Sequence, residues 1–230
     1  MLKRAADILI AAVLVVLTLP VVLIAAIGSA IALRAWPFFV QRRVGWDGMS
    51  FRFVKIRTLP TSTPKYMLKD ELHLEDIPRF TRALRVLHFD ELPQLFLVLT
   101  GRMSLVGPRP EMIEFHDLLE PAFARERCAV RPGCTGLWQI GWGCSGLLGE
   151  SPEYDRFYLR HQRLRLDLWI VWRTGRLMLG LGGLVAVDDV PTWAADHDPN
   201  PEALKKPGRR PGRRPRRARE AEPAIVEAVE

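Results

Sequence analysis

Residues 8–33 read ILIAAVLVVLTLPVVLIAAIGSAIAL, and this stretch sets the organisation of the whole chain. Its twenty-six positions carry no charged side chain. As a straight helix they would extend about 39 Å, which exceeds a bilayer core of roughly 30 Å. The run is too long for a cleavable signal, and no small-residue cleavage site precedes the polar part of the chain. We therefore interpret it as a permanent membrane-embedded segment.

Basic residues flank this segment on both sides. Lys3 and Arg4 precede it, and Arg34, Arg42 and Arg43 follow it. A helix spanning in either orientation would place basic residues on the outer side, against the positive-inside bias. The charges therefore favour an arrangement in which both ends face the cytosol.

Pro20 lies near the middle of the apolar run. It removes a helix hydrogen bond and clashes with the carbonyl of Val16. Each half is then about 18 Å long, too short to cross the bilayer, and Thr18 is placed to bond a carbonyl freed at the break. We expect residues 1–35 to form a re-entrant helix-break-helix anchor, the alternative being an ordinary kinked span.

The rest of the chain divides into a folded body and a tail. The chain has 230 residues, of which 48% are apolar, enough to bury a core over residues 36–190, the expected cytosolic catalytic domain. Residues 191–230 shift to Pro, Asp and Arg and are expected to be disordered. The formal charge of +7 comes from nine tail residues, which leave the remainder near neutral: Lys205, Lys206, Arg209, Arg210, Arg213, Arg214, Arg216, Arg217 and Arg219.

The three cysteines, Cys128, Cys134 and Cys144, form no CxxC pair. An odd number without ligand spacing argues against a disulfide framework or a zinc site. We expect reduced thiols in a cytosolic body.

The expected fold is mainly α with a small β-hairpin. Two apolar strands over residues 38–43 and 51–57 flank Asp47-Gly48, which is typical of a hairpin turn. Trp- and Arg-rich amphipathic helices near the end suit the headgroup plane of a membrane, the alternative being ordinary packing on the core. The expected helices are 79–88, 92–99 closed by Gly101, 111–124, one or two within 154–179, and a short one near 66–72.

Asp90 and Glu91 are adjacent acids that open an apolar helix. Acids near a helix N-terminus offset the macrodipole, and Pro93 suits a first turn, so capping alone would explain them. The alternative is that the two carboxylates carry chemistry.

Two arginines sit in rigid turns. Arg109 stands between Pro108 and Pro110, and Arg131 precedes Pro132. Restricted backbone freedom suits a guanidinium that must meet a phosphate in fixed geometry.

Further basic residues gather before the acids. Arg79, Arg82 and Arg85 share one face of the expected helix 79–88, where structural ion pairing is an equal explanation. The hairpin carries four more that line either an anion site or a solvated surface: Arg42, Arg43, Lys55 and Arg57.

Several motifs occur together and in order: FFVQRRVGWDGMSFRFVKIRT, FDELPQL, MSLVGPRP, RPGCTGLWQI and YDRFYLRHQRLRLDLWIVWRT. With the basic start and the proline-broken apolar segment, they resemble the bacterial sugar transferases, the small monotopic phosphoglycosyl transferases that act on polyprenyl phosphate. The resemblance covers about residues 3–180.

This resemblance implies transfer of a sugar 1-phosphate from a UDP-sugar to undecaprenyl phosphate, giving a lipid diphosphosugar and UMP. The reaction would be the first membrane step of polysaccharide or glycoconjugate synthesis, on the cytosolic face of the inner membrane. Matched to the family, Asp90 would be the nucleophile that takes the phosphosugar, Glu91 would help to hold Mg²⁺, and Arg109 would bind phosphate. No nucleic-acid partner is implied.

The chemistry of the residues agrees with these roles. A carboxylate approaching a diphosphate is repelled by about 4 kcal/mol per pair of unit charges about 4 Å apart at an effective dielectric of 20. Cations must offset this, and we expect Arg57, Arg85, Arg109 and Arg131 to do so. The alternative function is a non-catalytic membrane scaffold whose basic tail binds anionic lipid or nucleic acid.

Overall fold

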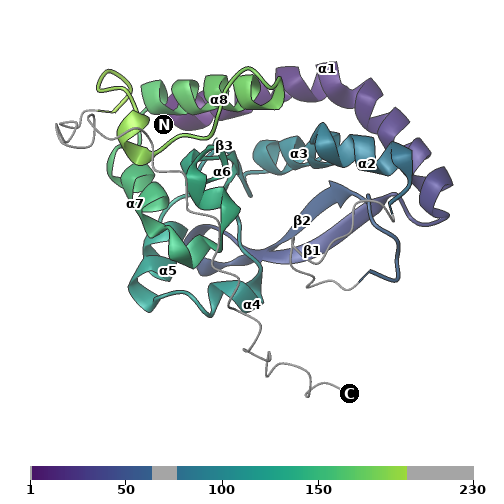
Figure 1. The fold of residues 1–230 in the computed structure, drawn as a ribbon, viewed down its shortest axis with the longest axis horizontal. Helices are drawn as coiled ribbons and strands as arrows, with labels where there is room; N and C mark the ends of the chain where they lie inside the picture. Colours follow the sequence, from purple (N-terminus) through teal and green to yellow (C-terminus); the bar gives the residue numbers. More distant parts are fainter. Residues whose placement is uncertain (1, 64–76, 196–230) are drawn as a thin grey trace.

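The computed structural model describes residues 2–63 and 77–195 (Figure 1). It is mostly helical with a small antiparallel hairpin, as the sequence predicts. Its helices and strands are α1 (Leu2–Leu33), β1 (Phe38–Val44), β2 (Ser50–Ile56), α2 (Arg79–Val86), α3 (Gln94–Leu99), β3 (Ser104–Val106), α4 (Ile113–His116), α5 (Pro121–Cys128), β4 (Gly133–Thr135), α6 (Leu137–Ile140), α7 (Pro152–Arg160) and α8 (Leu164–Met178). Single 3-10 turns are η1 (Trp46–Gly48), η4 (Phe89–Glu91), η5 (Trp142–Ser145), η6 (Leu148–Glu150) and η7 (Val187–Asp189).

The hairpin forms where the sequence predicts it. β1 and β2 pair antiparallel, with Phe38 opposite Ile56 and Val44 opposite Ser50. Asp47 and Gly48 both have positive φ, 56° and 70°, which is the conformation that an Asp-Gly hairpin turn provides. Because side chains alternate along a strand, β2 buries Phe51 and Phe53 in the core.

A second, parallel pair of strands joins two of the motifs. In β3 and β4, Ser104 lies opposite Gly133 and Val106 opposite Thr135. The sequence gives no alternating pattern for this pair, because each strand has only three residues. The approach is so close that a Cβ on Gly133 would lie 2.1 Å from the amide nitrogen of Gly107.

Gly133→Ala is therefore expected to destabilise the protein by about 1–3 kcal/mol, because the added methyl group forces the two backbones apart. Thermal unfolding in detergent micelles measures this loss. Gly183→Ala is the matched control, because a Cβ there meets no atom within 4 Å. Equal melting temperatures for the two variants would show that the close approach is not required.

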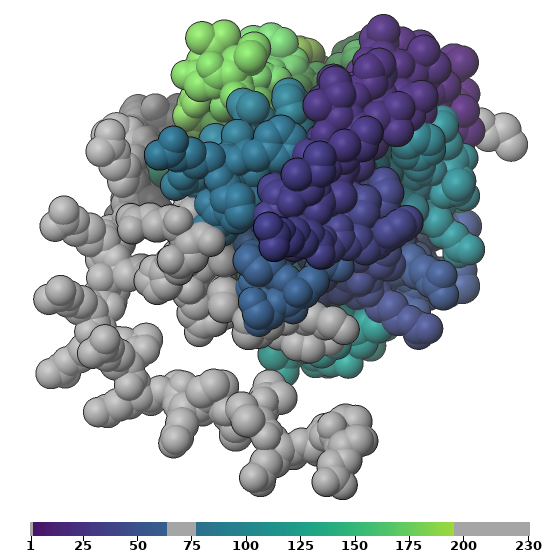
Figure 2. Space-filling view, turned by 90° about the vertical axis from the view of Figure 1, so that its right-hand side faces the viewer, coloured from purple at the N-terminus to yellow at the C-terminus, as the bar shows by residue number. Residues whose placement is uncertain are grey.

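α1 is a single helix that continues through Pro20. It runs behind α8 and then slopes down past α2, and Figure 2 shows it lying along the outside of the body. Thr18 Oγ1 donates to the carbonyl of Leu14 at 2.7 Å, one turn back, so the expectation that it bonds a carbonyl freed by Pro20 is wrong. A proline and a back-bonded threonine both bend helices, which accounts for a change of direction without a break.

The described part of the chain contains one helix long and apolar enough to cross a membrane, namely α1, whose most apolar window has a mean hydropathy of 3.1. Most of its large apolar side chains are exposed, among them Leu9, Val16 and Ile24. Small residues such as Ala11 and Ala25 face the body instead.

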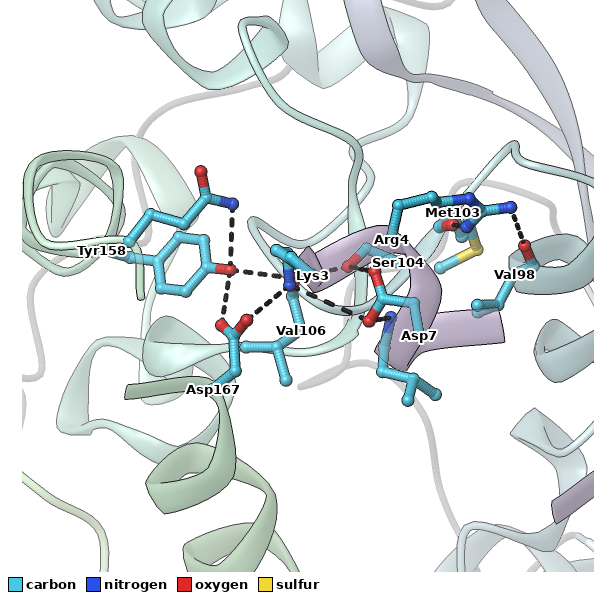
Figure 3. Close-up of polar contacts among 11 residues, drawn as sticks. Lys3, Arg4, Asp7, Val98, Met103, Ser104, Val106, Tyr158 and Asp167 are labelled. Carbon is cyan, nitrogen blue, oxygen red and sulfur yellow. Dashed lines mark hydrogen bonds and ion pairs between the residues drawn. The ribbon is translucent and has the colours of Figure 1, made fainter. Parts of the chain in front are cut away.

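The first turns of α1 are fixed to the body by Lys3 (Figure 3). Its Nζ lies 2.7 Å from Oδ2 of Asp167 on α8 and 3.1 Å from the carbonyl oxygen of Val106 on β3. The hydroxyl of Tyr158 on α7 lies within hydrogen-bond distance of both acceptors, at 2.8 Å from Asp167 and 3.0 Å from Val106. One network therefore ties α1 to three elements of the body.

Two neighbours extend this attachment (Figure 3). Asp7 accepts a hydrogen bond of 2.7 Å from the Ser104 hydroxyl. Arg4 donates to the carbonyls of Val98 at 2.7 Å and Met103 at 3.3 Å. The first of these belongs to the last turn of α3, where carbonyls have no partner within the helix and a cation is favourable.

The other end of α1 contacts the same body. The Ser29 hydroxyl donates to the carbonyl of Arg57 just after β2. A Cβ on Gly28 would lie 2.3 Å from the Phe80 ring of α2. Both ends of the apolar helix therefore pack on one folded unit.

Two predicted helical regions are divided in the structure. The helix expected over 111–124 is replaced by α4 and α5, because Glu120 caps α5 by accepting bonds from the amides of Ala122 and Phe123, and Pro121 starts it. The region 154–179 forms α7 and α8, one of the two arrangements expected.

The packed body extends further along the chain than its composition predicts. Ala194 and Ala195 are buried in the main core, so the body extends five residues past the expected boundary at 190. The predicted tail from 196 onward and the predicted short helix near 66–72 lie outside the described residues. The three cysteines do not form disulfides with one another.

Candidate active site

Asp90 and Glu91 lie in η4, in the corner between α2 and α3. His88 has a left-handed backbone with φ of 57°, which turns the chain after α2 and begins η4. α3 starts only at Gln94 and has no side-chain cap. The capping interpretation of the two acids therefore gains no support.

Glu91 is held by a lysine from the hairpin. Lys55 Nζ on β2 lies 2.5 Å from Glu91 Oε1. Burial raises the pKa of Glu91, but Lys55, through charge and hydrogen bond, and the charge of Arg109 outweigh it and bring the pKa to about 2. Glu91 is thus a carboxylate at any physiological pH.

Asp90 has a different environment. It is only 4% exposed, and its carboxylate forms no hydrogen bond or ion pair with the part of the chain that the structure describes. Burial raises its pKa, and Glu91 raises it further, whereas Lys55 and Arg85 act in the opposite direction. A buried carboxylate with free lone pairs and nearby cations is well suited to attack an electrophile.

Arg109 joins these acids from the turn after β3. Its charge lowers the pKa values of Glu91 and Lys55. The turn is fixed through its carbonyls, since Pro108 O accepts from the Gly133 amide at 2.9 Å and Arg109 O accepts from Arg127 at 2.5 Å. The guanidinium of Arg109 therefore extends from an immobilised backbone.

Of the other three predicted arginines, one lies at the site and two make contacts elsewhere. Arg85 donates to the Thr58 hydroxyl at 3.4 Å and lowers the pKa of Asp90, so it belongs to the site. Arg57 donates to the carbonyl of Trp36 at 2.9 Å. Arg131 donates to the carbonyl of Gly101 at 2.9 Å and lies 4.4 Å from the Trp46 ring centre. The geometry therefore gives Arg57 and Arg131 structural contacts and offers no support for their predicted phosphate binding.

Two of the four hairpin cations, for which the sequence left an anion site and a solvated surface open, lie at the site. Lys55 pairs with Glu91, and Arg43 is buried, donating to the Pro110 carbonyl at 2.6 Å. Burial and the charge of Arg109 lower the pKa of Arg43 to about 10. Together with Arg85 and Arg109 they give four cations around two carboxylates, an excess of positive charge that suits a diphosphate.

Cys134 is a second potential nucleophile near the acids. Burial and the negative charges of Glu91 and Asp7 raise the pKa of its thiol to about 12. Only the thiolate is nucleophilic. The Cys134 thiol is therefore protonated at neutral pH, which argues against Cys134 as a nucleophile.

The donor set fits a magnesium ion shared with a substrate. Among residues 2–63 and 77–195 no group of three or more His, Cys, Asp and Glu side chains could enclose a metal. Mg²⁺ is commonly held by one or two carboxylates together with substrate phosphates and water. Asp90 and Glu91 supply that number of carboxylates, so the residues fit an ion that arrives with a diphosphate.

The sequence matches a known family and named relatives. The family model for bacterial sugar transferases matches residues 1–180. The chain is 34% identical over 187 residues to a UDP-N-acetylgalactosamine-undecaprenyl-phosphate N-acetylgalactosaminephosphotransferase of Aeromonas hydrophila, covering 77% of this chain and 44% of that protein. It is 34% identical over 186 residues to a UDP-glucose:undecaprenyl-phosphate glucose-1-phosphate transferase of Caulobacter vibrioides, covering 77% and 67%.

A third relative is matched over most of its length. The exopolysaccharide production protein ExoY of Rhizobium meliloti is 32% identical over 193 residues, which cover 76% of this chain and 84% of that protein. The chain spans less than half of the Aeromonas relative. The match of the family model to most of the chain shows that this protein belongs to the bacterial sugar transferase family.

Proposed function

We propose that this protein transfers a sugar 1-phosphate from a UDP-sugar to undecaprenyl phosphate, and that Asp90 carries the phosphosugar between the two. The observation that carries the proposal is the contrast between the two acids. Glu91 is neutralised by Lys55, whereas Asp90 is buried, unpaired within the described residues and surrounded by cations. The names of the Aeromonas and Caulobacter relatives support the choice of donor and acceptor.

The reaction has two displacements. In the first, an Asp90 oxygen forms a bond to the phosphorus that bears the sugar, and the bond from that phosphorus to the bridging oxygen breaks. UMP leaves with the electron pair. In the second, an oxygen of undecaprenyl phosphate attacks the same phosphorus and the Asp90 carboxylate is released. One site then serves two substrates in turn, which gives ping-pong kinetics.

The cations of the site act mainly through charge. Lys55, Arg85 and Arg109 offset the repulsion between the Asp90 carboxylate and the diphosphate and stabilise charge on the transferring group. Glu91, with Asp90 beside it, would hold Mg²⁺. When bound, the ion neutralises phosphate oxygens and the leaving UMP.

The test is UMP release by the full chain in nanodiscs with a panel of UDP-sugars and undecaprenyl phosphate, with and without a chelator. The proposal expects one or a few sugars to support release, and expects the chelator to stop it. If no donor releases UMP while the protein remains folded, the proposed function is contradicted. The alternative function, a non-catalytic membrane scaffold, does not explain why Asp90 is buried near cations. It also depends on a tail that lies outside the described residues.

The attachment of α1 supports a re-entrant anchor in the cytoplasmic membrane. Its first turns bond to β3 and α8, and its last turns bond to the end of β2. A spanning helix would place these two ends on opposite sides of a core about 30 Å thick. Leu168 and Trp172 on α8 are exposed. We infer that the apolar outer side of α1 enters the membrane from the cytosolic side and that these two residues lie at the headgroups.

Cysteine labelling is expected to show both ends of α1 on the cytosolic side. Leu2 and Trp36 are 72% and 71% exposed, so single cysteines at these positions in a cysteine-free chain should react with an impermeant maleimide. We expect labelling of both in inside-out vesicles and of neither in right-side-out vesicles. Labelling of the two positions from opposite sides would establish a spanning helix.

A further inference from the structure

The turn that carries Arg109 is anchored by donors from several distant segments. Because prolines at 108 and 110 have no N–H, the turn depends on its carbonyls. Pro108 O is bonded by the β4 backbone, Arg109 O by the Arg127 guanidinium of α5, and Pro110 O by the Arg43 guanidinium of β1. Two of the three donors are therefore side chains.

Arg127 also belongs to a buried ion pair. Its Nε donates to Oδ2 of Asp155 on α7 at 2.7 Å, while its Nη2 donates to the Arg109 carbonyl at 2.5 Å. Arg127 is 6% exposed and Asp155 is 2% exposed. The guanidinium is planar and rigid, so fixing Nε by Asp155 also fixes the direction of Nη2.

A buried ion pair adds little stability if it serves only to pack the core. Replacing such a pair by apolar residues of similar volume is often neutral or stabilising. Here the second donor of the pair contacts the peptide of Arg109, whose side chain acts on Glu91 and Lys55. The pair therefore joins α5 and α7 to the phosphate-binding side of the active site.

We propose that Arg127, oriented by Asp155, is a positioning residue that holds Arg109 in place for the transferring phosphate. The inference rests on the proposed function. Displacements of about 1 Å in a catalytic group can cost about a hundredfold in rate, so loosening this peptide should slow transfer even though Arg127 touches no substrate.

Arg127→Lys tests the inference, because a lysine can keep one of the two contacts but lacks the fork that makes both. We expect UMP release to fall about ten- to a hundredfold, mainly in kcat, while the melting temperature shows that the protein stays folded. Arg156→Lys is the matched control. Arg127 and Arg156 both lie over the Phe123 ring, at 5.7 Å and 5.2 Å from its centre. Arg156 instead pairs with the surface residues Glu120 and Glu126, so its replacement should leave turnover unchanged.

A double-mutant cycle separates positioning from general damage. In an Arg109→Lys background, Arg127→Lys should cause little further loss, because it acts through Arg109. If Arg127→Lys lowered the rate of UMP release by the same factor in both backgrounds, the inference would be overturned. If Arg127→Lys does not fold, Asp155→Asn, which keeps an acceptor for Arg127 without its charge, completes the same cycle. Absence of UMP release by the wild type would instead remove the proposed function, and the inference with it.

Discussion

Asp90→Asn is expected to abolish UMP release, by about 10⁴-fold or more, because an amide cannot replace the carboxylate as nucleophile and losses of this order follow removal of a nucleophile. The substitution preserves shape. Asp90 has no hydrogen bond or ion pair within the described chain, so little structure depends on it. Initial rates of UMP release from the preferred UDP-sugar measure the loss.

Stability should change in the opposite direction to activity. Burial raises the pKa of Asp90, which means that its ionised form is less favourable in the folded than in the unfolded chain. At neutral pH an uncharged Asn is therefore expected to keep or increase the melting temperature. Asp117→Asn is the control, because Asp117 is an exposed acid on α4's C-terminal side. Turnover retained by Asp90→Asn would remove Asp90 from the mechanism.

Lys55→Met is expected to reduce kcat about a hundredfold, the size of effect seen when one electrostatic stabiliser is removed from an active site. It should also change the pH profile. In the wild type Glu91, with a pKa of about 2, stays ionised in acid, so the acidic limb comes from Asp90. Without Lys55, burial raises the pKa of both acids, and the limb should move to higher pH.

The profile of kcat against pH checks this prediction, with Lys55→Arg as the control that keeps a positive charge. The lowered pKa of Glu91 also makes the stability of the fold depend on pH. A carboxylate whose pKa is lowered stabilises the fold above its ordinary pKa, and this contribution disappears as the pH falls toward 2. An unchanged acidic limb in Lys55→Met would show that Lys55 does not control the charge of the acids.

Turn and cap residues predicted the elements that depend only on residues close in the sequence. The hairpin follows from Asp47-Gly48 between apolar strands, and the end of α3 follows from Gly101, whose φ is 82°. The division between α4 and α5 was also readable, since Glu120-Pro121 is a start signal inside a region taken as one helix.

The direction of the basic side chains could not be predicted, because it depends on contacts between distant segments. Lys55 reaches Glu91 across 36 positions, and Arg127 reaches the Arg109 carbonyl across 18. Arg131 stands in a rigid turn like Arg109, yet it contacts the carbonyl of Gly101 instead of the acids. The prolines marked both turns as rigid, but they did not tell which way each guanidinium extends.

Mass spectrometry of the intact chain tests the central claim most directly. The protein is mixed with its preferred UDP-sugar in the absence of undecaprenyl phosphate and quenched in acid. We expect one equivalent of UMP, a mass increase of one sugar phosphate located on the peptide that contains Asp90, and loss of that increase when undecaprenyl phosphate is added. UMP release that requires the acceptor, with a chain mass that never changes during turnover, would contradict the account.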